Sequence, residues 1–209
     1  MPSEKHATII DLLRHGEPQG GRRYRGHGID DPLNEKGWVQ MRAAVAGHCP
    51  WTQIVSSPLQ RCQAFARELS RQQDIPLSVD ERLKEVGFGD WEGFTRAEIQ
   101  ARDPAGYHAF YADPVNCRPP GAESLAAFFS RVSAALEDIV SDFAGRQVLV
   151  VAHAGVIRGV IAHVLRTPAE TAYRVQVNNA ALSRVHHRGN GFELDFHNCP
   201  TIPESKMTD

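Results

Sequence analysis

Short apolar runs along the chain alternate with longer segments in which apolar residues recur every three or four positions. The runs at residues 7–13 and 147–152 are rich in β-branched side chains and predict buried strands. Shorter runs predict strands at 53–56 and 77–79, and two final strands are expected near 182–187 and 192–196. Because strands alternate with helical segments without an internal repeat, we expect a three-layer α/β/α fold around a mostly parallel mixed sheet.

Helix starts are marked by capping residues. Asn34 is expected to cap a helix, and Ser57 followed by Pro58 predicts another helix with Ser57 at its N-cap. The longest periodic stretch follows Ser124 and is expected to be a core helix. Its apolar face comprises Leu125, Phe128, Phe129, Val132, Leu136, Ile139, Val140 and Phe143. Two short helices, 95–101 and 104–111, are expected to form a cap at about 94–120, and a polar flexible tail is expected from about 200 to 209.

Length and composition restrict the class of protein. The chain has 209 residues, 42% of them hydrophobic, which fits a single domain over residues 1–209. A formal net charge of -2 argues against nucleic acid or an anionic membrane as a partner. The first six residues lack the apolar core of a signal peptide, so a cytoplasmic location is expected. The four cysteines are scattered and no metal-binding spacing is present, so we expect free thiols, no metal and no cofactor.

Two of the predicted strands end in similar polar residues. The first is followed by Arg14-His15-Gly16 and the other by His153-Ala154-Gly155. Ligands bind at the carboxyl ends of strands in α/β sheets, where an arginine holds phosphoryl oxygens and a histidine can attack phosphorus. One Arg-His pair by itself is equally consistent with an exposed turn, but the second strand end and Arg61 make a constellation. A cation such as Arg61 near a helix N-terminus opposes the helix dipole, and a bound anion would account for it.

Further candidates lie in loops. Gly21, Arg22, Arg23, Tyr24 and Arg25 belong to a basic loop at 18–33, which is either solvated or meets an anionic substrate at the pocket rim.

The segment 83–93 is glycine-rich and carries three carboxylates, of which Asp90 and Glu92 are expected to be solvated or capping groups. Glu123 is expected to orient the site or cap the following helix, and we include it among the substrate-binding candidates. The amides of Ala154 and Gly155 at a helix start can cradle an anion.

Several of these motifs occur together in a known order. They are Arg14-His15-Gly16, Ser56-Ser57-Pro58-Leu59-Gln60-Arg61, Leu83-Lys84-Glu85-Val86-Gly87, Arg118-Pro119-Pro120-Gly121-Ala122-Glu123-Ser124-Leu125 and Val151-Ala152-His153-Ala154-Gly155. Over residues 9–182 the chain resembles the histidine phosphatase superfamily, which contains cofactor-dependent phosphoglycerate mutases and small phosphomonoesterases.

The resemblance implies a role for each matching residue. His15 would form a phosphohistidine, Glu85 would be the general acid, and Arg14, Arg61 and His153 would hold the phosphoryl oxygens. Where much of the family has a polar residue that touches phosphate, often Asn, this chain has Gly21. A backbone N–H or a neighbouring arginine would then replace that contact.

The short cap and the Pro-Pro-Gly-Ala-Glu-Ser box resemble the α-ribazole phosphatase branch most closely. We therefore expect a metal-independent phosphomonoesterase acting on a small phosphorylated metabolite, with α-ribazole 5′-phosphate as the candidate that this branch suggests. Other possibilities are a broad small-molecule phosphatase, a phosphoglycerate mutase, or a non-catalytic protein that senses phosphate. A monomer or homodimer is expected.

Overall fold

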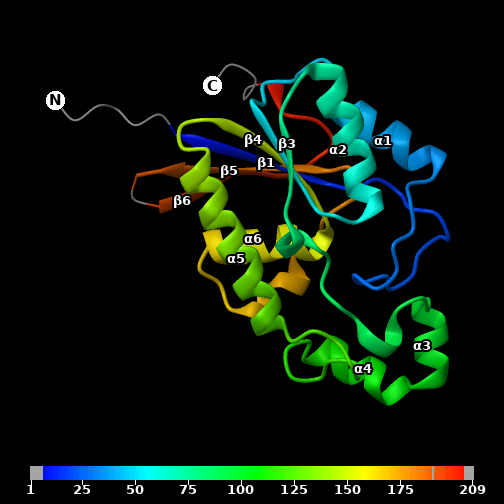
Figure 1. Cartoon of the computed structure of the whole chain (residues 1–209). Helices are drawn as coiled ribbons and strands as arrows, with labels where there is room; N and C mark the ends of the chain where they lie inside the picture. The colour runs from blue at the N-terminus through cyan, green and yellow to red at the C-terminus, as the bar shows by residue number, and fades with distance from the viewer. Residues whose placement is uncertain (1–6, 190, 205–209) are drawn as a thin grey trace.

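A computed structural model describes residues 7–189 and 191–204. Its centre is a six-stranded sheet with the order β3-β2-β4-β1-β5-β6 (Figure 1). The strands are β1 (Thr8–Arg14), β2 (Gln53–Ser56), β3 (Leu77–Val79), β4 (Gln147–Ala152), β5 (Leu182–Arg188) and β6 (Gly191–Cys199). The first four strands pair in parallel, whereas β5 and β6 are antiparallel to their neighbours. The expected α/β class with a mostly parallel mixed sheet is confirmed.

Helices cover both faces of this sheet (Figure 1). On one face, α1 (Glu35–Val45) and α2 (Gln60–Gln73) share a core with Leu13 and Val151. On the other face, α5 (Leu125–Asp142) and α6 (Ala154–Val164) pack on Leu12 and Val150. Alternate residues of one strand thus enter opposite cores, as the two-residue period of a strand requires.

The cap lies beyond one end of the sheet (Figure 1). It contains α3 (Arg96–Arg102) and α4 (Pro104–Ala112), each within a residue of its expected bounds. Two short 3₁₀ turns, η1 (Glu81–Leu83) and η2 (Gly89–Trp91), lie between β3 and the cap, and a third, η3 (Ala169–Arg174), lies between α6 and β5. A separate aromatic core of Tyr24, Trp91, Ile99 and Phe110 holds the cap together.

Two local expectations are wrong. Helix α2 begins at Gln60 with Leu59 as its N-cap; the Ser57 hydroxyl accepts from Leu59 N at 3.3 Å and also contacts His153. Ile202 is buried in the core beside α1 and α2, so the flexible tail does not begin at 200; residues 205–209 and the N-terminal tail 1–6 lie outside the described residues. The cap expected at Asn34 is confirmed, and Ser124 is the N-cap of α5.

Candidate active site

The two polar strand ends meet at one edge of the sheet. Strands β1 and β4 are parallel neighbours, with Arg14 opposite Ala152. The backbone N–H of His15 donates to the carbonyl of Ala152 at 3.0 Å, and the ring centroids of His15 and His153 are 5.2 Å apart. The structure therefore brings together the two histidines that the strand patterns indicated.

The His15 imidazole is held in one tautomer. Its side chain is buried, and Nδ1 lies 2.7 Å from the carbonyl oxygen of Gly16. A carbonyl oxygen can only accept, so Nδ1 carries the hydrogen and Nε2 keeps a free lone pair. Burial, with the charges of Arg14 and Arg61, holds the His15 pKa well below its ordinary value. A neutral imidazole with a free Nε2 has the form that a nucleophile requires.

Both expected arginines are fixed by backbone carbonyls. Arg61 is only 1% exposed, and its terminal nitrogens donate to the oxygens of Ile29 at 3.0 Å and Gly26 at 2.8 Å. Arg14 Nη1 donates to the Val177 oxygen at 2.6 Å. In the described part of the chain, the buried Nε groups of Arg14 and Arg61 have no hydrogen-bond acceptor. Such buried donors are costly without a partner, and a phosphoryl oxygen would supply one.

His153 is fully buried at the N-cap of α6. Its Nε2 lies 2.7 Å from the hydroxyl of Ser57, the residue that follows β2. Burial lowers the pKa of His153 well below its usual value, and the charge of Arg61 adds to this. The sequence pattern predicts Ser57 only as a helix cap, although its place after a predicted strand is a signal for a contact at the site.

Glu85 sits against the N-terminus of the same helix. One carboxyl oxygen accepts from Gly155 N at 3.2 Å, and the other accepts from Val86 N at 2.9 Å. A Cβ on Gly155 would lie 2.1 Å from Glu85 Oε1, so only glycine allows this approach. The Glu85 charge also acts on Arg14, whose pKa burial lowers to about 10. The expected acid thus shares a helix end with His153 and interacts with Arg14.

Glu123 is engaged by the protein itself. Arg131 donates to both of its carboxyl oxygens, at 2.7 and 2.8 Å, and Gly87 N donates to one of them. Arg131 also donates to the carbonyl of Glu85. Glu123 therefore helps to orient the segment that carries Glu85, and its contact with substrate stays a prediction. Arg131 was missed because nothing in a periodic helix marks a long-range partner.

The basic loop is also largely occupied by internal contacts. The Tyr24 hydroxyl is 2.8 Å from that of Tyr111 in the cap. Arg23 and Arg25 both pair with Asp31, at 3.2 and 2.7 Å. Substrate binding by Tyr24, Arg23 and Arg25 stays a prediction, and among the described residues the buried Nε of Arg23 has no hydrogen-bond acceptor.

Three further residues also remain predicted substrate contacts: two in the loop and Ala154. Gly21 is exposed, adopts a positive φ of 71° and gives its carbonyl to Arg25. Arg22 is exposed and close enough to Arg14 to lower its pKa. Ala154 is buried at the first position of α6.

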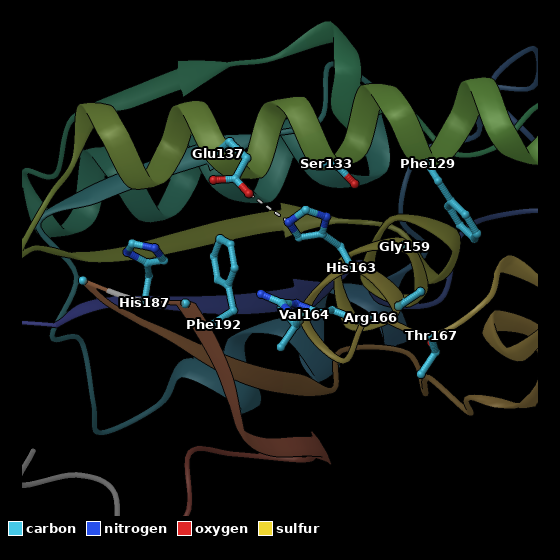
Figure 2. Close-up of a pocket in the computed structure, with 13 residues that line it drawn as sticks. Phe129, Ser133, Glu137, Gly159, His163, Val164, Arg166, Thr167, His187 and Phe192 are labelled. Carbon is cyan, nitrogen blue, oxygen red and sulfur yellow. Dashed lines mark hydrogen bonds and ion pairs between the residues drawn. The ribbon is translucent and has the colours of Figure 1, made fainter.

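A larger cavity than the one at the site lies away from these residues. A groove of about 780 Å³ runs between α5, α6 and the β5–β6 hairpin, where Glu137 bonds to His163 at 2.9 Å (Figure 2). None of the candidate residues lines it. A smaller cavity of about 100 Å³ is the one that reaches Glu85 and Gly155. Within the described ranges, no three acidic, histidine or cysteine side chains are placed to hold a metal, and no helix is long and apolar enough to cross a membrane.

Comparison with known proteins agrees with this geometry. A bifunctional protein of Mycobacterium tuberculosis is 36% identical over 181 residues, which cover 84% of this chain and 49% of that protein. The chain thus spans about half the length of the first relatives that it matches. The adenosylcobalamin/alpha-ribazole phosphatase of Salmonella typhimurium is 30% identical over 178 residues, 83% of this chain and 88% of that enzyme.

A solved structure of mycobacterial glucosyl-3-phosphoglycerate phosphatase is 30% identical and superposes with a TM-score of 0.82, covering 93% of this chain and 100% of that one. The sequence profile of the histidine phosphatase superfamily, branch 1, matches residues 10–200. The chain belongs to the histidine phosphatase superfamily.

Proposed function

We propose that this protein is a phosphomonoesterase that works through a phosphohistidine on His15 and acts on a small phosphorylated metabolite. The observation that carries the proposal is the pairing of a neutral His15, with Nε2 free, with two buried guanidinium groups whose Nε donors lack acceptors. A phosphoryl group would meet a nucleophile and positive charge in one place.

The reaction has two steps. His15 Nε2 attacks phosphorus, the bond from phosphorus to the alcohol oxygen breaks, and Glu85 gives its proton to that oxygen. Water then attacks the phosphohistidine, Glu85 takes a proton from the water, and the bond from phosphorus to Nε2 breaks. Arg14, Arg61 and His153 hold the non-bridging oxygens as negative charge spreads in each transition state.

Two substrates deserve direct trial because relatives carry their names. One is α-ribazole 5′-phosphate, and the other is glucosyl-3-phosphoglycerate. The short cap supports hydrolysis, since a mutase must keep its intermediate from water long enough to return the phosphoryl group.

The test is phosphate release from a panel of phosphomonoesters, with and without EDTA, for wild type and His15→Ala. The panel contains both named substrates, 3-phosphoglycerate, sugar phosphates and p-nitrophenyl phosphate. Turnover that survives EDTA and is lost in His15→Ala is expected. Phosphate release by His15→Ala would reject the nucleophile, and isomerised product without phosphate release would indicate a mutase.

A further inference from the structure

The cavity of about 100 Å³ beside Glu85 is lined by two polar residues that the proposed phosphoryl chemistry does not use, Arg158 and Tyr173. The other lining residues are Val86, Phe88, Leu125, Phe128, Phe129, Gly155 and Ala172, besides Glu85 itself. The cavity is therefore mostly apolar, with an acid at one side and a cation in its wall.

Arg158 is held next to Arg14. Its Nε donates to the carbonyl of Val175 at 2.8 Å, and Arg14 donates to the carbonyl of Val177. Two residues of chain span at most about 7 Å, so the two anchor points are close. The two guanidinium groups are near enough that Arg158 contributes to lowering the pKa of Arg14. No described residue offers the terminal nitrogens of Arg158 a hydrogen-bond acceptor.

Tyr173 presents a hydrogen to the same cavity wall. Its oxygen accepts from Arg118 Nη1 at 2.9 Å. A guanidinium only donates, so the phenolic hydrogen remains available for another acceptor. Arg118 is itself fixed, because its remaining nitrogens donate to the carbonyls of Glu123 at 3.0 Å and Gly87 at 2.8 Å. The guanidinium carbon of Arg158 also lies over the ring of Tyr173, 5.8 Å from the ring centroid.

We propose that this cavity is a second anion subsite, which takes a carboxylate on the alcohol part of the phosphomonoester through Arg158 and the Tyr173 hydroxyl. The proposal rests on the proposed function, because it assumes that a phosphoryl group occupies the site at Arg14. One guanidinium and one hydroxyl suit a single carboxylate, and the small volume suits a short carbon skeleton.

The test compares two probes that differ in the carboxylate: 3-phosphoglycerate and glycerol 3-phosphate. Arg158→Met keeps the length of the side chain and removes its charge. Its kcat/KM for 3-phosphoglycerate is expected to fall about 30-fold, chiefly through KM, and to change less than about threefold for glycerol 3-phosphate. Arg158→Lys is expected to recover part of the preference. Tyr173→Phe tests the subsite independently, because it removes the one hydroxyl that is proposed to donate to the carboxylate.

A matched control is Arg166→Gln, since Arg166 is exposed just beyond the same helix and lines the separate groove (Figure 2). It should leave the kinetics with both probes unchanged. Equal losses on both probes in Arg158→Met, or no loss on either, would overturn the subsite.

Failure of the proposed function is detected separately. Binding of the two probes is measured by calorimetry on the His15→Ala protein, which needs no turnover. A preference for 3-phosphoglycerate that disappears in the His15→Ala, Arg158→Met double variant supports the subsite even if wild type releases no phosphate. Equal binding of the two probes by His15→Ala overturns the subsite whether or not the enzyme is a phosphatase.

Discussion

Replacing Gly155 with alanine should displace the catalytic acid while leaving the fold intact. The added Cβ would lie 2.1 Å from Glu85 Oε1, whereas ordinary contacts begin near 3.4 Å. The carboxyl group must therefore move by more than about 1 Å and give up its bond to Gly155 N. A misplacement of that size costs about 100-fold in rate. Alanine is the better helix former by up to about 1 kcal/mol, so stability should not fall.

The assay is steady-state hydrolysis of an alkyl phosphate and of p-nitrophenyl phosphate, with thermal unfolding alongside. Because we propose that Glu85 protonates the leaving oxygen, Gly155→Ala should slow the alkyl ester far more than the aryl ester, whose leaving group needs little help.

Gly159→Ala is the matched control, one turn later in α6. There the added Cβ meets Phe129 and Val132 rather than a carboxylate, at 3.1 and 3.3 Å. It should stay within about twofold of wild-type activity. Equal and near-normal rates for Gly155→Ala on both esters would refute the assignment of Glu85 as the acid.

Three further results are expected. The two site histidines have pKa values below 6.5 in the fold, so the unfolded chain binds protons first as pH falls. As pH falls from 7.5 to 5.5, each histidine should lower the free energy of unfolding, measured by urea titration without phosphate, by about 1.4 kcal/mol. An unchanged pH dependence in His15→Asn would contradict this. Asp11→Asn removes the buried charge partner of Arg184 and should cost about 3–5 kcal/mol by the same method, and a loss below about 1 kcal/mol would refute it. The Glu92 carboxylate accepts hydrogen bonds from the backbone amides of Gly28 and Phe88, and Gly26 in the same loop as Gly28 binds Arg61. Glu92→Gln should therefore loosen this loop and raise KM several-fold, and an unaltered KM would count against a connection between Glu92 and Arg61.

The positions of the central residues can be predicted from the sequence, because these residues directly follow segments whose apolar pattern predicts a strand. Apolar β-branched runs that end at His15 and His153 predict two strands with imidazoles at their ends, and the sheet makes those strands neighbours. The placement of these two histidines needs only the residue order and the period of the elements. The position of Arg61 against its helix dipole is consistent with an anion site, but most of the weight for its role comes from the family resemblance.

Contacts that depend on long-range pairing could not be predicted in the same way. Ser57 reaches His153 because β2 lies beside β4, and strand order is not visible in one sequence. Arg131 and Arg158 occupy ordinary helix positions, and their carbonyl partners become apparent only in three dimensions. Arg25 could equally have met a substrate or Asp31, and composition alone cannot separate the two.

The most direct test of the account is detection of the covalent intermediate. The wild-type enzyme is mixed with an excess of substrate, quenched within milliseconds, and digested for mass spectrometry under alkaline conditions that preserve phosphohistidine. The account predicts one phosphoryl group, bound to His15 and absent from His15→Asn. Full turnover with no modification at His15, or phosphate bound to another side chain, would contradict it.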